Sequence, residues 1–278
     1  MKKILFLSLA LAGGLFVPVA AHSQFATGVS SYTQGTGPDP SYNDPTVALG
    51  APSQITPGPF GGPVDPFGPP YLSSQIVGLG AGGSLTLHFD MPILNDPSHP
   101  YGLDFIIFGH SGFNITNGDY SGGGITDGSF FTGGTSTSHI SVSADGTNFY
   151  VLNPSLAPQI DGLFPTDGSR DPLKAVNPAL TQSAFAGKDL TGIRSLYAGS
   201  AGGMAFDLSM AQDGLGNPVS IPVANYVRIS VLSDSAYIDA VSVVPEPGSC
   251  VLLLLGISGW CWNAVRRHKL PGHQPRPR

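Results

Sequence analysis

The stretch Ser84-Leu85-Thr86-Leu87-His88-Phe89 alternates strictly between polar and apolar residues. Successive side chains of a β-strand point to opposite faces, so Leu85, Leu87 and Phe89 fall on one face. His88 points away from that face, and we expect it at the surface. The pattern predicts a strand of an antiparallel sheet with one buried face.

Similar patterns continue outward from this strand in both directions. Leu103–Phe108 is almost continuously apolar, which predicts a central strand of a sheet. Residues 139–143 and 149–152 flank Asp145-Gly146, a turn dipeptide that favours a hairpin. Further strands are predicted at residues 25–32, 75–79, 224–232 and 237–244.

Long segments without periodicity separate these strands. Residues 35–70, 112–137 and 153–203 are rich in glycine, proline or small polar residues and are predicted to be loops. The chain has 38 glycines and 26 prolines. We therefore expect an all-β fold, an antiparallel β-sandwich of the jelly-roll type with long Gly/Pro-rich loops.

Both ends of the chain have the composition of targeting segments. Met1-Lys2-Lys3 is positively charged, an apolar region follows from Ile4 to Val19, and small residues come next. This arrangement predicts a signal peptide at residues 1–23 and export through the secretory translocon. The outer domain would then span residues 24–244.

The C-terminal segment predicts a membrane helix. Residues 248–265 carry no charge, and 18 helical residues span about 27 Å, enough for a thin bilayer core. The basic residues Arg266, Arg267 and Lys269 follow, which predicts a cytoplasmic tail at residues 270–278. A plain tail anchor and a buried core helix are the alternatives.

The motif Pro245-Glu246-Pro247, the apolar stretch and the basic cluster together resemble the PEP-CTERM sorting signal. The resemblance covers about residues 245–269. It implies recognition by an exosortase, a membrane-embedded processing enzyme, in a bacterium that makes exopolysaccharide. The extension after the basic cluster is longer than is usual for this signal. The resemblance implies a cell-surface or extracellular location after possible cleavage.

The charge of the outer domain restricts its partners. Residues 22–244 contain five lysines and arginines against seventeen aspartates and no glutamate, a balance of −12. Such a surface argues against nucleic acids and anionic membranes as partners, and it permits divalent cations. Aspartate without glutamate also favours turns over helices.

The order of motifs in the outer domain resembles bacterial cell-surface proteins with a discoidin-like or galactose-binding-like β-sandwich. The strand at 103–108, the segment around Asp145-Gly146 and the element Phe206-Asp207-Leu208 carry this resemblance. It implies a jelly roll of about eight strands that binds with loops at one end. This chain has Gly109-His110 and Met204-Ala205 where such relatives often carry acidic residues.

A calcium site is the sharpest chemical hypothesis. Asp104, Asp207 and Asp239 each lie beside an apolar strand, and calcium prefers several oxygen ligands. An aspartate within a strand is also unfavourable unless something compensates it. The alternative is that these residues cap turns or pair with Arg194 and Arg228.

The predicted loops contain aromatic residues that could stack on sugar rings. Phe130, Phe131 and Tyr120 are the main candidates for ligand binding, and Phe60, Phe67, Tyr71 and Phe113 are further ones. The alternative is that they pack the loops onto the sandwich.

The sequence contains no motif that specifies a catalytic site. His110-Ser111 with a nearby aspartate could suggest a triad, but no Gly-x-Ser-x-Gly elbow, cysteine nucleophile or glutamate pair is present in the outer domain. We therefore predict a non-catalytic module that binds a glycan or another polymer. The alternatives are a structural matrix or biofilm protein without a discrete ligand and a carbohydrate-active enzyme.

Overall fold

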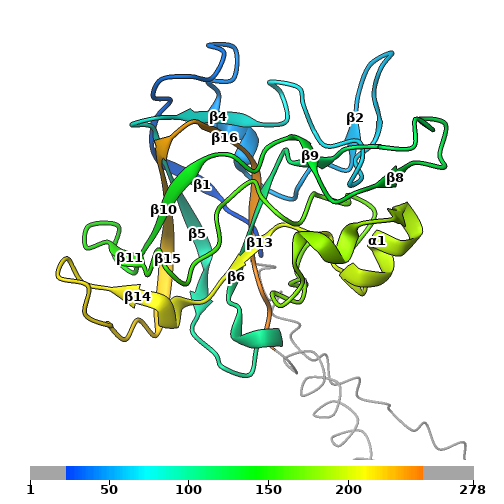
Figure 1. Ribbon diagram of the computed structural model, residues 1–278. Coiled ribbons are helices and arrows are strands. Elements are labelled where there is room, and N and C mark those ends of the chain that lie inside the picture. Colours follow the sequence, from blue (N-terminus) through cyan, green and yellow to red (C-terminus); the bar gives the residue numbers. More distant parts are fainter. Residues whose placement is uncertain (1–22, 247–278) are drawn as a thin grey trace, which may run out of the picture.

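A computed structural model describes residues 23–246 (Figure 1). Within that range the fold is all-β, and every pairing between strands is antiparallel. The predicted fold class is therefore confirmed at this level. Residues 1–22 of the predicted signal peptide, the predicted membrane helix at 248–265 and the basic cluster lie outside the described residues. No helix between residues 23 and 246 has the length and apolar character needed to cross a bilayer.

The larger sheet has six strands in the order β1-β5-β15-β10-β11-β14. Their bounds are β1 Gly28–Thr33, β5 Ser84–Leu94, β15 Val223–Ser233, β10 Thr137–Ser143, β11 Tyr150–Leu152 and β14 Ala211–Gln212. Leu85, Leu87 and Phe89 of β5 are buried, whereas His88 is partly exposed, as the alternation predicts. The predicted hairpin is β10–β11, and the Asp145 carboxylate accepts hydrogen bonds from the amides of Thr147 and Asn148 in its turn.

The second sheet has four strands in the order β13-β6-β16-β4. Their bounds are β13 Met204–Phe206, β6 Phe105–Gly109, β16 Ser235–Val243 and β4 Val77–Gly80. All five residues of β6 are buried, and the strand lies between β13 and β16. The continuous apolar run therefore forms an inner strand, as predicted.

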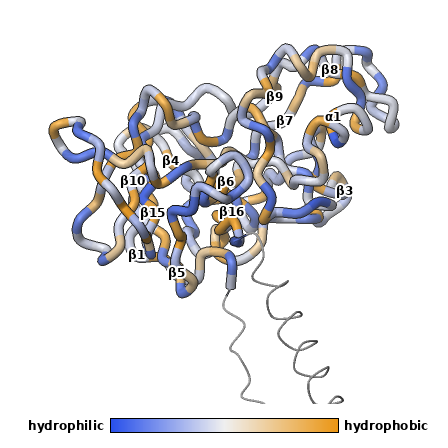
Figure 2. Tube along the Cα trace, turned by 90° about the horizontal axis from the view of Figure 1, so that it is seen from below, coloured by the Kyte–Doolittle hydropathy of each residue, from blue (hydrophilic) through white to orange (hydrophobic). Residues whose placement is uncertain are grey.

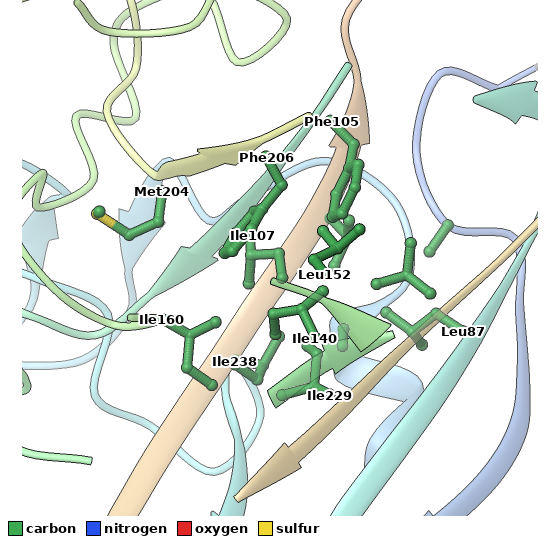
Figure 3. Packing of buried hydrophobic residues seen from close by; sticks show 14 of the residues in the cluster. Leu87, Phe105, Ile107, Ile140, Leu152, Ile160, Met204, Phe206, Ile229 and Ile238 are labelled. Atoms are coloured by element: carbon green, nitrogen blue, oxygen red, sulfur yellow. The ribbon is translucent and has the colours of Figure 1, made fainter. Parts of the chain in front are cut away.

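One hydrophobic core joins the two sheets and gives the fold its sandwich-like character. Figure 3 shows Leu87, Ile140 and Ile229 of the larger sheet meeting residues of the smaller one. The rings of Phe105 and Phe206 stack at 5.2 Å between centroids. In Figure 2, hydrophobic and hydrophilic stretches alternate along β10 and β15, which is the pattern of strands with one buried face.

The long excursions form short strands and one helix on one side of the sandwich, away from β11 and β14 (Figures 1 and 2). These elements are β2 Ile55–Thr56, β3 Gly62–Pro63, β7 Gly112–Phe113, β8 Ile125–Thr126, β9 Phe130–Thr132, β12 Lys188–Asp189 and α1 Leu190–Tyr197. Single 3₁₀ turns lie at η1 Pro45–Ala48, η2 Pro100–Gly102, η3 Gln182–Phe185 and η4 Leu208–Met210.

The helix α1 is the main element that the sequence pattern does not predict. The carboxylate of Asp189 caps it by accepting a hydrogen bond from the Gly192 amide at 2.7 Å. Ile193 and Tyr197, one turn apart, are its buried residues. With the partly buried Leu196, only three positions of this eight-residue helix pack against the core, so the apolar period is too short to stand out within a 50-residue loop.

The two ends of the described chain lie side by side. The amide of Val243 donates to the carbonyl of Gln24, and the amide of Ala26 donates to the carbonyl of Val241. The last strand, β16, pairs with both β6 and β4 and so occupies the interior of its sheet.

Candidate functional site

A concave feature of the surface lies where the excursions meet. It has a volume of about 400 Å³ and is bordered by the β2–β3 hairpin, the segment that follows it and strand β9. Most of its lining is apolar or glycine: Phe60, Phe67, Tyr71, Phe131, Pro63, Pro69, Pro70, Gly61, Gly62 and Gly68, with Thr56, His110 and Thr132 as the polar residues. We call this feature the aromatic groove.

Three of its aromatic side chains are largely exposed to solvent. Phe60 is 91% exposed, Phe131 56% and Tyr71 42%. Phe60 lies in the loop that joins β2 to β3, and the Tyr42 hydroxyl fixes the next segment by donating to the Tyr71 carbonyl at 2.7 Å. Several exposed aromatic rings around one concavity are typical of a binding surface. Aromatic residues that serve only packing would be buried in the core.

Strand alternation explains why neighbouring phenylalanines of β9 differ. Phe130 points inward and stacks on Phe113, with centroids 5.1 Å apart and planes at 17°. Phe131 points outward into the groove, and its ring lies against Gly112 so closely that a Cβ there would be 2.6 Å from the ring. Of the three predicted ligand-binding residues, Phe131 therefore lies in the groove and Phe130 supports it from beneath.

Tyr120, the third predicted ligand-binding residue, lies in a neighbouring cavity. It is 79% exposed and lines a hollow of about 270 Å³ together with Asp65, Asp119 and Phe67. Phe67 and Gly68 line both hollows, so the two adjoin.

A hydrogen-bonded chain of three side chains lies at the polar part of the groove. His110 directly follows β6, and its Nδ1 is 2.5 Å from Oδ2 of Asp161. Its Nε2 is 2.6 Å from Oγ1 of Thr132, the last residue of β9. The His110 side chain is largely buried, and Asp161 is almost completely buried.

Asp161 is held by the backbone as well as by His110. Its carboxylate accepts hydrogen bonds from the amides of His110 at 2.7 Å, Ser111 at 2.6 Å and Tyr237 at 3.2 Å. The residue has a left-handed φ of 52°. Sequence reasoning considers an aspartate near His110, but the partner lies 51 residues away in a loop without periodicity. No local signal could have identified it.

Of the aspartates of the predicted calcium site, Asp104 and Asp207 lie near each other, whereas Asp239 lies apart from both. Asp104 directly precedes β6, whereas Asp239 lies in β16 opposite the far end of β6, next to Ile238, which pairs with Gly109. The length of β6 therefore separates the two aspartates. At about 3.3 Å per residue the separation is roughly 16 Å. Among residues 23–246, no group of three or more His, Cys, Asp or Glu side chains has an arrangement that could hold a metal ion.

Each of the three aspartates has a protein partner instead. Asp104 accepts from the Leu208 amide at 2.8 Å and contacts Nδ1 of His99 at 2.8 Å, and burial raises its pKa. Asp207 caps η4 by accepting from the Ser209 amide. Asp239 accepts from the amide and the hydroxyl of Ser53, both at 2.8 Å, and burial raises its pKa to about 7.

The two arginines considered as partners for these aspartates lie elsewhere. Arg194 of α1 forms a bidentate pair with buried Asp167, with distances of 2.6 and 3.1 Å. Arg228 of β15 lies over the ring of Phe149, 3.6 Å from its centroid. Of the alternatives to a calcium site, turn capping by Asp207 is thus observed, and ion pairing with Arg194 or Arg228 is not.

The predicted sorting motif falls at the border of the described residues. Pro245 and Glu246 directly follow the buried Val244, whose amide donates to the Asp104 carbonyl. Pro247 and the basic residues Arg266, Arg267 and Lys269 lie outside the described residues. Comparison with known proteins finds no family model and no curated protein that matches this chain.

Proposed function

We propose that this chain is an exported cell-surface or extracellular-matrix protein whose outer domain binds a polysaccharide or a similar neutral polymer. The observation that carries the proposal is the aromatic groove, in which Phe60, Tyr71 and Phe131 expose their rings around one concavity. Sugar rings present apolar C–H faces that stack on aromatic side chains, while the surrounding polar groups hydrogen-bond to hydroxyls.

The charge of the domain favours a neutral ligand over an anionic one. Residues 22–244 carry a balance of −12, and Asp65 and Asp119 line the hollow next to the groove. Acidic polysaccharides and nucleic acids would be repelled by this surface at moderate ionic strength. Because Phe67 lies in both hollows, a polymer long enough to cover them is a better fit than a monosaccharide.

We also propose a fold family and a cellular location for the protein. A discoidin-like or galactose-binding-like jelly roll is consistent with two antiparallel sheets around one core. The signal peptide and the PEP-CTERM-like tail favour export through the translocon, membrane anchoring and processing by an exosortase. Replacement of Pro245, Glu246 and Pro247 by alanine should abolish processing, measured as retention of the C-terminal segment by mass spectrometry in cells that contain an exosortase.

A glycan array probed with the full-length chain in detergent tests the binding function. We expect saturable binding to neutral oligosaccharides that is lost in Phe60→Ala and Phe131→Ala. Leu215→Ala is the matched control, because Leu215 is exposed in the loop after β14, on the other side of the molecule. Blank arrays, or equal binding by both groove variants and the wild type, would overturn the proposal in favour of a purely structural matrix protein.

A further inference from the structure

The hydrogen bonds around His110 determine which of its ring nitrogens carries the proton. The Asp161 carboxylate is an acceptor for three backbone amides, and it faces Nδ1 at 2.5 Å. Nδ1 is therefore the N–H donor of the neutral ring, and Nε2 has a free lone pair. That lone pair accepts the hydroxyl proton of Thr132 at 2.6 Å. The arrangement is a hydroxyl, a base that contacts it and a carboxylate that orients the base.

The position of the base is fixed by packing as well as by hydrogen bonds. The ring of His110 lies on Tyr237, with centroids 4.5 Å apart. Gly109 leaves no space for a side chain, since a Cβ there would be 2.4 Å from Oδ1 of Asp161. A rigidly held base and nucleophile need little reorganisation during a reaction, which is the condition for efficient catalysis by positioned groups.

Access to the hydroxyl distinguishes Thr132 from its neighbour Ser111. His110 and Thr132 both line the aromatic groove. The Ser111 hydroxyl donates to the carbonyl of Gly162 at 2.8 Å and is nearly buried. Thr132 is thus the hydroxyl that a molecule in the groove would meet together with the base.

We propose that the aromatic groove hydrolyses small acyl esters, with Thr132 as nucleophile, His110 as general base and Asp161 as the positioning residue. The Thr132 oxygen attacks the acyl carbonyl while Nε2 of His110 takes its proton. The ester C–O bond then breaks, and the proton passes from His110 to the leaving alkoxide, which departs as an alcohol. Water attacks the acyl-threonine with His110 again as base, and a carboxylic acid leaves as the threonine hydroxyl is restored.

The groove indicates the class of ester. Its walls are aromatic and proline-rich and its surroundings are acidic, so an uncharged acyl group on a neutral alcohol, such as an O-acetyl group on a carbohydrate, fits best. This activity goes beyond the binding module proposed above. It does not depend on glycan binding, because the acyl step requires only a small ester.

Two measurements on the full-length chain in detergent test the activity. The first follows release of p-nitrophenol from p-nitrophenyl acetate. The second treats the protein with an alkyl fluorophosphonate, which forms a stable phosphonyl ester with an activated hydroxyl, and locates the adduct by mass spectrometry. We expect saturable turnover, and an adduct on Thr132.

Matched variants separate chemistry from folding. Thr132→Val and His110→Gln should lower turnover by roughly 100-fold or more, and Thr132→Ser, which keeps the hydroxyl, should retain it. Thr116→Val is the control, because this threonine lies in the neighbouring loop and does not line the groove. Circular dichroism checks that each variant is folded.

Turnover with an adduct on Thr132 that is lost in folded Thr132→Val supports the proposal. A wild-type chain without turnover or adduct, or an adduct only at another residue, would overturn it. Persistence of turnover in folded Thr132→Val would also overturn it. A blank glycan array with esterase activity would refute the binding function alone, so the two proposals fail separately.

Discussion

Replacement of Asp239 by asparagine should remove a pH dependence from the stability of the outer domain. Asp239 is the extra residue at an irregularity in β16, where Ile238 pairs with Gly109 and Ala240 with Phe108. Such a bulge turns a side chain out of the regular alternation. Here the carboxyl group is directed to Ser53, its only hydrogen-bonding residue among the described ones, and is almost fully buried.

The magnitude follows from the shift of its pKa. Burial raises the pKa from the ordinary value of 3.8 to about 7, because the folded protein favours the neutral acid. The resulting stabilisation is full below pH 3.8, decreases as the pH rises and is lost above about pH 7. A difference of roughly 3 pKa units corresponds to about 4 kcal/mol in total, of which roughly 2–3 kcal/mol falls between pH 5 and pH 8.

Asparagine preserves the two hydrogen bonds without the titration. Its carbonyl can accept from the Ser53 amide, and its amide can donate to the Ser53 hydroxyl. Urea unfolding followed by far-ultraviolet circular dichroism at pH 5 and pH 8 should therefore show a difference between variant and wild type that grows by roughly 2–3 kcal/mol in favour of the variant.

Because the variant is compared with the wild type at each pH, the contributions of the other aspartates to the pH dependence of stability cancel. Asp90→Asn, at an exposed position of β5, serves as the control and should follow the wild type at both pH values. Parallel profiles for wild type and Asp239→Asn, or a variant that loses stability relative to wild type at pH 8, would refute the reasoning.

Three further substitutions test the packing and pairing, each by urea unfolding at constant pH. Phe105→Ala should lower the free energy of unfolding by about 3–5 kcal/mol, because it leaves a cavity beneath Phe206; a loss below 1 kcal/mol would contradict the stacked core. Arg194→Ala should cost roughly 3 kcal/mol by removing the closer ion-pair partner of the buried Asp167 carboxylate and leaving only Arg170 at 3.9 Å, with recovery in a second variant that also carries Asp167→Asn. Asp189→Ala should cost about 1 kcal/mol through loss of the α1 cap, whereas Asp189→Asn should be nearly neutral.

The strands were predictable because their signals are local. The alternation at residues 84–89 and the turn at Asp145-Gly146 each lie within a few neighbouring residues, and β5 and the β10–β11 hairpin follow from them. The helix α1 has a weak signal because it is short and only Ile193, Leu196 and Tyr197 pack against the core. Its first turn also contains Gly192, which is a poor helix former.

The candidate site was only partly predictable, for a different reason. Exposure of Phe131 follows from strand alternation, and its identity as a ligand-binding candidate follows from its residue type. The pairing of His110 with Asp161 and Thr132 depends on three segments that only the finished fold brings together. Likewise, the partner of the Asp239 carboxyl group, Ser53, lies 186 residues away, so no local pattern predicts the pair.

The contact between residues 24–26 and residues 241–243 means that the domain can be completed only after its last strand is available. The carbonyl of Gln24 and the amide of Ala26 find their partners in Val243 and Val241, and β16 fills the interior of its sheet. A chain that emerges N-terminus first would therefore leave β4 and β6 without their shared neighbour until residues 235–243 arrive. The four-stranded sheet is thus completed by contacts between residues far apart in the sequence, and such contacts form more slowly than local ones. On the proposed secretory route, the four-stranded sheet would therefore stay incomplete until residues 235–243 have passed through the translocon.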